Sequence, residues 1–196
     1  MRICAGLPYA VSAMLAEVCQ TAALKLGIPM SVALVDAEGG LQFFSRMDGT
    51  LPVSTDLAVS KAYTAAVLRM PTHELGKLAQ PGGKLYGIQY GHNGKIVLFG
   101  GGFPLKVRGI VVGAVGVSGG TVEEDMRVAT SATDLLAEMD LWLQQVAELS
   151  LKDDGRIPSM EWMKDALDQE LRSRVHVSPD SPTLQAVIGG ALLALG

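Results

Sequence analysis

The chain has 196 residues, of which 48% are hydrophobic and only 5% aromatic, and its mean hydropathy is +0.30. This composition predicts a tightly packed core of small aliphatic side chains and some apolar surface buried between subunits. The net charge is -4 and the basic residues do not cluster in the sequence, which argues against a nucleic-acid-binding protein. Two cysteines, Cys4 and Cys19, are too few for a disulfide scaffold and lack metal-knuckle spacing.

Neither a membrane span nor an efficient leader is predicted. The apolar runs near Val111 and Ala186 are short and interrupted by glycine. The opening residues, MRICAGLPYAV, make a poor signal peptide because one Arg and a Pro stand within a short apolar run. We therefore expect a cytoplasmic protein.

Helical periodicity and capping signals predict several helices in the main body of the chain. The predicted helices cover residues 11–26, 54–68, 73–79 and 121 to about 150. Gly27 supplies a C-cap for the first of them, and the second must end before Pro71.

Strand-like runs alternate with these helices. The predicted strands cover residues 31–35, 41–47, 86–90, 95–99 and 110–117. A turn at 36–40 joins the first pair, and Asn93-Gly94 joins the second pair in a hairpin. Five strands, mainly in hairpins, predict an α+β fold with an antiparallel sheet and helices packed on one side. The glycine-rich stretch 100–104 is left unassigned.

A polar break at 152–156 predicts a boundary between a main domain, 1–151, and a C-terminal appendage, 152–196. The appendage should form a helix, a short strand and an apolar helix. Because about forty-five residues bury little core alone, we expect it to dock on the main body or on a neighbouring subunit.

The stretch GIVVGAVGVSGGTVEED, from Gly109 to Asp125, predicts a strand, a glycine turn and a helix start. Thr121 and Glu124 have the spacing of a capping box. The backbone amides of such a turn can hold a carboxylate, propionate or phosphate, although the glycines also suit close packing alone. Lack of a Gly-Lys-Ser/Thr end excludes a Walker loop. The candidate ligand-binding residues are Gly116, Ser118, Gly119, Gly120 and Thr121.

Five motifs in order resemble the GlcG/HbpS-like family, which includes the C-terminal domain of PduO corrinoid adenosyltransferases: VALVDAEGGLQFFSRMDG, SKAYTAAVLRMPTHEL, QPGGKLYGI, GKIVLFGGGFPL and GIVVGAVGVSGGTVEED. The resemblance covers roughly residues 7–139. It implies a five-stranded antiparallel sheet flanked by helices and a homo-oligomer. It also implies haem binding in several members and, for others, genes beside glycolate or propanediol utilisation.

The tail MEWMKDALDQELRSRVHVSPDSPTLQAVIGGALLALG resembles the C-terminal end of ASKHA ATPases that activate CoA-dependent reductases and dehydratases. The ATP-binding glycine loops of those proteins have no counterpart here. The resemblance therefore implies a packing or docking segment, through which a metabolic enzyme partner could bind, and no ATPase activity.

Haem would need an axial ligand such as His, Cys, Met or Tyr. His73, at a helix start, is one candidate, and Cys19 and Met14 are others, although both also suit the core stripe of the first helix. That helix lacks the histidine expected of haem-binding members. His92, on a turn, and His176, in the appendage, are weaker candidates.

Three further residues are candidates for ligand binding. Arg46 could hold a carboxylate, or pair with Asp48 at a strand end. Lys61 and Tyr63 stand among small residues that let a ligand come close, whereas the alternative for Lys61 is that it extends to the surface.

No catalytic residues are predicted, because no Ser-His-Asp set, acid pair or metal cluster is evident. The acids Glu123, Glu124 and Asp125 are explained by the helix dipole. The leading hypothesis is a non-enzymatic accessory protein that binds haem, a related tetrapyrrole or a small acidic metabolite in diol or glycolate catabolism. The alternatives are a recruitment module acting through 152–196 and an enzyme acting on small hydroxy acids.

Overall fold

The computed structural model describes residues 7–152, with the backbone alone for 142, 143 and 145–152. The predicted appendage lies outside these residues, as does His176. The first of two compact units ends at Leu136, within the last helix, and the boundary expected near residue 152 stays a prediction.

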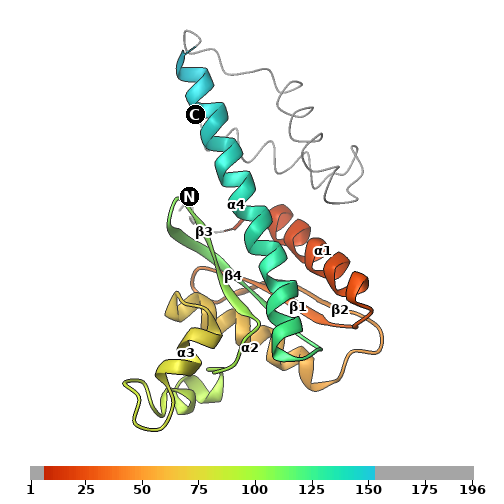
Figure 1. Ribbon diagram of the computed structural model, residues 1–196, viewed down its shortest axis with the longest axis vertical. Coiled ribbons are helices and arrows are strands. Elements are labelled where there is room, and N and C mark those ends of the chain that lie inside the picture. Colours follow the sequence, from red (N-terminus) through yellow and green to blue (C-terminus); the bar gives the residue numbers. More distant parts are fainter. Residues whose placement is uncertain (1–6, 153–196) are drawn as a thin grey trace. The chain divides into compact units, whose positions relative to one another are not determined.

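Four α-helices and two short 3-10 helices form in the described residues (Figure 1). Their bounds are α1 Tyr9–Leu26, α2 Val53–Leu68, α3 Thr72–Leu78, η1 Ile88–Tyr90, η2 His92–Gly94 and α4 Val122–Lys152. The predicted C-cap of α1 is confirmed, because Gly27 has φ 69° and its amide donates to the carbonyls of Ala23 and Leu24. All four predicted α-helices therefore exist close to their expected bounds.

The sheet has four strands, all antiparallel, in the order β2-β1-β4-β3. The strands are β1 Ser31–Asp36, β2 Leu41–Arg46, β3 Gly102–Val107 and β4 Ile110–Ser118. The α+β class and the antiparallel sheet are confirmed, but the prediction of five strands is wrong.

The two strands predicted at 86–90 and 95–99 do not form. Gly87 has φ 88°, and His92 and Asn93 have φ 49° and 57°, so the chain coils through η1 and η2 instead of extending. Asn93-Gly94 does lie where the chain turns, but the prediction that this turn joins two strands is wrong.

Strand β3 was not predicted, because its glycine and Pro104 are residues with low strand propensity. It is an edge strand, and proline is tolerated at an edge because an outward-facing position needs no N–H. A turn at Arg108 and Gly109, with φ 49° and 77°, joins β3 to β4. Two successive left-handed residues are what a two-residue hairpin turn requires.

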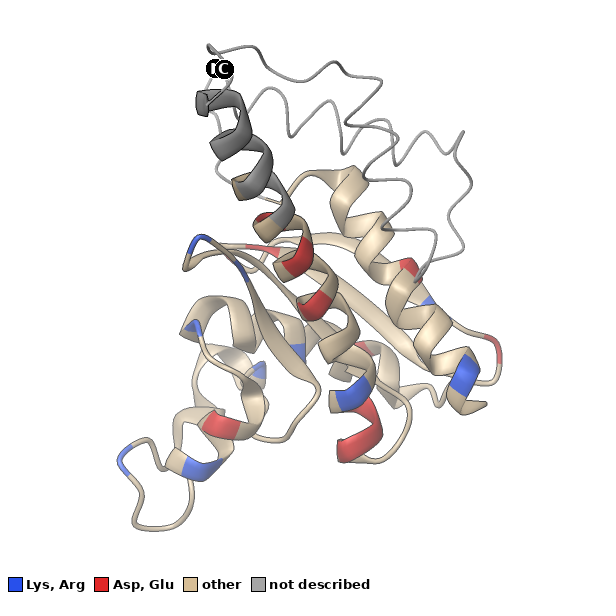
Figure 2. Cartoon of the chain, turned by 45° about the horizontal axis from the view of Figure 1, so that its top comes forward, with Lys and Arg blue, Asp and Glu red and all other residues tan. Residues whose placement is uncertain are grey.

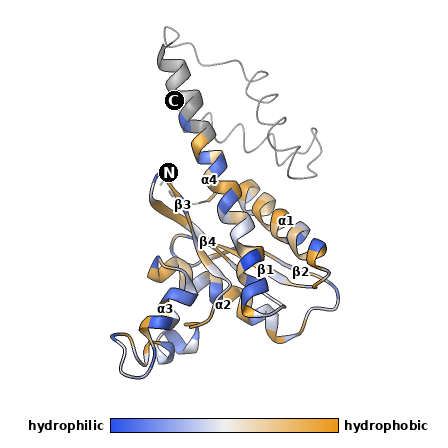
Figure 3. Cartoon of the chain, viewed as in Figure 1, coloured by the Kyte–Doolittle hydropathy of each residue, from blue (hydrophilic) through white to orange (hydrophobic). Residues whose placement is uncertain are grey.

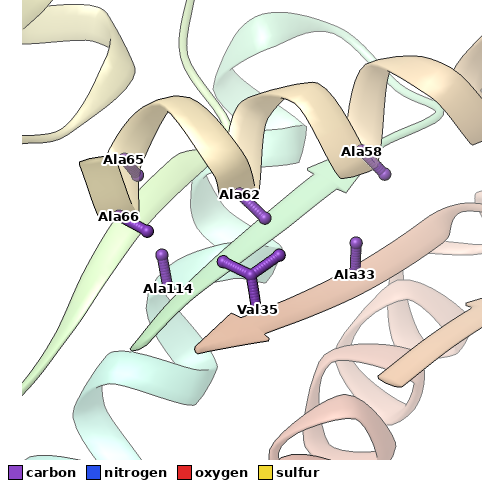
Figure 4. Packing of buried hydrophobic residues seen from close by; sticks show 7 residues of the cluster. All are labelled: Ala33, Val35, Ala58, Ala62, Ala65, Ala66 and Ala114. Carbon is purple, nitrogen blue, oxygen red and sulfur yellow. The ribbon is translucent and has the colours of Figure 1, made fainter. Parts of the chain in front are cut away.

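Helix α2 covers one face of the sheet with alanines. In Figure 4, Ala33, Val35 and Ala114 of the strands point toward the alanines of this helix. On β4, Gly116 lies where an added Cβ would meet backbone atoms of Ala58 and Ala62, so the expected packing role of this glycine is confirmed. Small residues on both surfaces thus let the helix approach the sheet closely.

The opposite face carries α1 and the first turns of α4 (Figure 1). Figure 3 shows α1 as hydrophobic along most of its length, and its residues Met14, Leu15 and Cys19 are fully buried. The expectation that all helices lie on one side is therefore wrong. Among the described residues, no helix is both long enough and apolar enough to cross a membrane.

Candidate functional site

A buried ion pair joins α2 to the start of α4. The Lys61 side chain is 0% exposed, and its Nζ donates to Asp125 Oδ2 at 2.6 Å and to the carbonyl of Val117 at 2.9 Å. The ring of Phe99 lies 4.9 Å from the same nitrogen. Lys61 therefore turns inward, and the alternative that it extends to the surface is wrong.

Burial and pairing act on both groups in opposite directions. Burial lowers the pKa of Lys61 and raises the pKa of Asp125, because each charged form loses water, and the partner's opposite charge resists both shifts. The second oxygen of Asp125 accepts a hydrogen bond from the amide of Gly120 at 3.0 Å. Both oxygens of this buried carboxylate are therefore used.

Asp125 was not a predicted site residue. Figure 2 shows the acidic first turn of α4, and the helix dipole explains Glu123 and Glu124 but not an acid with 4% of its side chain exposed. The signal that could have found Asp125 was Lys61 itself. A lysine that is buried on an alanine-rich face needs a partner of opposite charge, although its own sequence neighbourhood does not tell which acid that is.

The glycine turn before α4 is closed by the chain's own carboxylates. Glu124 accepts from the Thr121 amide at 2.8 Å while Thr121 Oγ1 accepts from the Glu124 amide at 3.3 Å, so the capping box is confirmed. The Gly120 amide already binds Asp125. An external anion would compete with these two carboxylates, and ligand binding by Gly116, Ser118, Gly119, Gly120 and Thr121 stays a prediction.

The glycines 100–102 cover the buried lysine. A Cβ at Gly101 would lie 2.8 Å from Lys61 Nζ and 2.6 Å from the carbonyl of Val117, and one at Gly102 would meet the Lys61 carbonyl. Gly100 meets Met126 in the same way. Gly101 and Gly102 are therefore packed against backbone atoms of β4 and α2, where a larger residue would collide.

His73 lies at the first turn of α3, beside the edge strand β3. Its ring centroid is 5.5 Å from that of Phe103. Its Nδ1 is buried and has no hydrogen-bond partner among the described residues. Its ring therefore keeps an unused nitrogen, which is unusual for a buried polar atom.

The segment that follows α3 presents aromatic side chains to solvent. Tyr86 and Tyr90 are 61% and 80% exposed, and Phe99 is 42% exposed. Exposed aromatic rings of this kind offer a surface on which a flat apolar ligand can pack.

Tyr63, a predicted site residue, meets this segment from α2. Its hydroxyl lies 2.9 Å from Nδ1 of His92, and Nζ of Lys95 lies 5.4 Å from the centre of its ring. The structure thus brings Tyr63 together with His92 and Lys95, and separates it from Lys61, which points into the ion pair.

The other predicted residues lie apart. Arg46 is exposed and its Nη2 donates to the carbonyl of Thr50 at 2.8 Å, so it does not pair with Asp48. Met14 and Cys19 lie in the core, as their alternative interpretation required. Burial raises the pKa of the Cys19 thiol to about 12, and a side chain with no exposed surface offers no sulfur to an external iron. Among the described residues, no group of three potential metal ligands occurs.

The described chain is a small α+β domain with a four-stranded antiparallel sheet between helices. Its distinguishing feature is a buried lysine covered by a glycine segment. Residues 7–134 match the family described as "Haem degrading protein HbpS-like", and the chain belongs to this family. The resemblance of residues 7–139 to the GlcG/HbpS-like family is thereby confirmed, whereas the resemblance of the tail to ASKHA ATPases stays a prediction.

The chain is also similar to two curated proteins and to one solved crystal structure. It is 42% identical over 135 residues to an uncharacterized 15.0 kDa protein in the dhaT-dhaS intergenic region of Citrobacter freundii, a match that covers 69% of this chain and 95% of that one. It is 46% identical over 110 residues to the corrinoid adenosyltransferase PduO of Salmonella typhimurium, covering 56% of this chain and 33% of PduO. The chain thus corresponds to only about a third of that enzyme. A crystal structure of a PduOC:Heme complex superposes with a TM-score of 0.64 at 40% identity, over 66% of this chain and 94% of that chain.

Proposed function

We propose that this protein is a non-enzymatic accessory protein that binds haem or a related tetrapyrrole. The observation that carries the proposal is the similarity to a domain solved as a haem complex, at 40% identity over nearly all of that domain. A place in diol or glycolate catabolism, which the resemblance to the GlcG/HbpS-like family implies, is part of the same proposal, as is a cytoplasmic location.

Two features of this chain fit a tetrapyrrole. His73 keeps a ring nitrogen without a hydrogen-bond partner in the described residues, and imidazole is a common axial ligand of haem iron. Tyr86 and Tyr90 expose aromatic surface against which a macrocycle can pack. Bound haem would supply a redox-active iron, while the chain's own residues would hold and orient the macrocycle.

Titration with haem tests the proposal. The wild-type protein should give a saturable Soret shift at micromolar haem, and His73→Ala should change the position of the Soret maximum because the axial ligand is lost. Glu74→Ala is the matched control, since it removes an exposed side chain from the same turn of α3 and should leave the maximum where it was. Absence of any shift in the wild type would refute tetrapyrrole binding.

Self-association is the second part of the proposal. Large apolar side chains around α1 and β2 are exposed, among them Tyr9, Leu24 and Leu41. Strand β2 is also an edge of the sheet. Such apolar surface fits contact with a second copy of the chain. A native mass spectrum would report the number of subunits, and a purely monomeric spectrum at micromolar concentration would contradict this part. Recruitment of an enzyme through 152–196 stays a prediction.

A further inference from the structure

Tyr63, His92 and Lys95 form a polar cluster that packing alone does not explain. His92 and Lys95 are exposed, and the rings of Tyr63 and His92 lie 6.0 Å apart at an angle of 57°. The Tyr63 hydroxyl meets His92 Nδ1 at 2.9 Å, while the Lys95 ammonium lies 5.4 Å from the centre of the tyrosine ring. A phenol, an imidazole and an ammonium group are thus gathered at the surface from two distant parts of the chain.

The backbone under this cluster is held in a costly conformation. His92 and Asn93 both have positive φ, at 49° and 57°, although neither is glycine. Left-handed residues of this kind persist where the surrounding structure fixes them, and they concentrate at ligand sites. The hydrogen bond to Tyr63 is one interaction that fixes the His92 side chain.

The hydrogen bond also sets what the imidazole offers to solvent. We assign the Tyr63 hydroxyl as the donor and Nδ1 as the acceptor, which leaves the proton of the neutral ring on Nε2. Nε2–H and the Lys95 ammonium are then two donors on the same cluster. A carboxylate, with its two acceptor oxygens, matches such a pair.

Acidic residues near the cluster do not supply that carboxylate. The β1–β2 turn touches it, because a Cβ at Gly39 would lie 2.6 Å from the Tyr63 ring. Asp36 in this turn is already used, since its Oδ1 accepts from the amides of Glu38 and Gly40. Glu38 is exposed, and within the described residues it forms no hydrogen bond or ion pair with His92 or Lys95.

We propose that Tyr63, His92 and Lys95 form a carboxylate-binding site that holds a propionate group of the tetrapyrrole. This assignment rests on the proposed function, and it predicts that the protein distinguishes a free acid from its ester. The same chemistry would hold a free small carboxylate, so the two sources need separate measurements.

Titrations with haem and with its dimethyl ester test the site. The wild type should bind haem about tenfold more tightly than the ester, because the ester loses the charge-assisted hydrogen bonds. Lys95→Met should weaken haem binding by a similar factor and leave ester binding unchanged. Lys84→Met, an equal loss of charge in the same segment, should change neither. Equal affinity for acid and ester, or equal losses in the two lysine variants, would overturn the proposal.

A second measurement does not depend on haem binding. The ¹⁵N resonances of His92 should show the Nε2–H tautomer and should move saturably on addition of sodium propionate, with Tyr63→Phe abolishing the effect. If no Soret shift occurs but the propionate response is present, tetrapyrrole binding is refuted and the carboxylate site remains, for a free acid. If haem binds, but the protein binds haem and its ester with equal affinity and the His92 resonances do not respond to propionate, the site is refuted. The proposed function then remains.

Discussion

Removal of the Asp125 carboxylate should leave Lys61 as an unpaired buried ammonium. The lysine side chain is 0% exposed and the aspartate side chain 4%, so neither charge can reach water without local unfolding. Breaking one partner of such a pair costs about 3–5 kcal/mol. Because the Val117 carbonyl and the Phe99 ring still contact the ammonium, we expect the lower end of this range, about 3 kcal/mol, for Asp125→Ala.

The reverse change and the double change separate charge from packing. Lys61→Met keeps the length of the side chain and strands the carboxylate, which retains its hydrogen bond from the Gly120 amide, so a loss of about 2–3 kcal/mol is expected. The double variant Lys61→Met/Asp125→Leu removes both charges and should lie within about 1 kcal/mol of the native protein.

Equilibrium urea unfolding, followed by circular dichroism at pH 7, measures these differences. Glu123→Ala is the matched control, since it removes an exposed acid from the same turn and should change the free energy of unfolding by less than about 0.5 kcal/mol. Sodium formate should restore part of the stability of Asp125→Ala by replacing the lost carboxylate, and should not affect the native protein. A loss below about 1 kcal/mol in Asp125→Ala, or a double variant as unstable as the sum of the single ones, would refute the reasoning.

Three further outcomes are expected. Gly101→Ala should cost about 2–4 kcal/mol in urea unfolding, because φ is 111° and the new Cβ meets the Lys61 ammonium, whereas Gly82→Ala, with φ 82° but open space around it, should cost about 1 kcal/mol. Comparable losses at the two glycines would contradict the close approach at Gly101. Cys19 should destabilise the fold at alkaline pH: its folded pKa of about 12 exceeds the unfolded value of 9.0, so its contribution is complete below pH 9 and is lost as the pH rises toward 12. Between pH 8 and 10.5 that loss is about 2 kcal/mol, and a Cys19→Ala variant should not show it. Thr121→Ala should cost about 1 kcal/mol in thermal unfolding by removing the helix cap, and an unchanged melting temperature would argue against the cap.

Local signals predicted the parts of this fold that depend on local chemistry. Gly27 ended α1, and Thr121 with Glu124 began α4, because capping involves residues only a few positions apart. The hairpin of β1 and β2 was likewise readable from its two apolar runs and the turn between them.

Long-range partners decided what could not be predicted. Lys61 and Asp125 are 64 positions apart, and nothing within a short window of either residue reveals the other. Strand β3 extends because β4 is available to pair with it, which outweighs the poor strand propensity of its glycine and proline. The segment 86–99 has no such neighbour in the sheet, so it forms turns and 3-10 helices instead of strands, although Ile96 and Val97 within it are buried.

Strand β3 has an outer edge that is closed to further pairing. The bond from the Val117 amide to the Gly101 carbonyl, at 2.8 Å, sets the alternation of the ladder, so residues 102 and 104 direct their polar groups away from β4. The outward amide of Gly102 donates to Thr72 Oγ1 at 3.1 Å, and Pro104 has no amide proton to offer. Of the two edges in the described sheet, β2 is thus the one that carries no proline. Addition of a foreign strand at β2 could join two molecules edge to edge, but the blocked β3 side would stop the chain of additions there, which protects the protein against fibre growth.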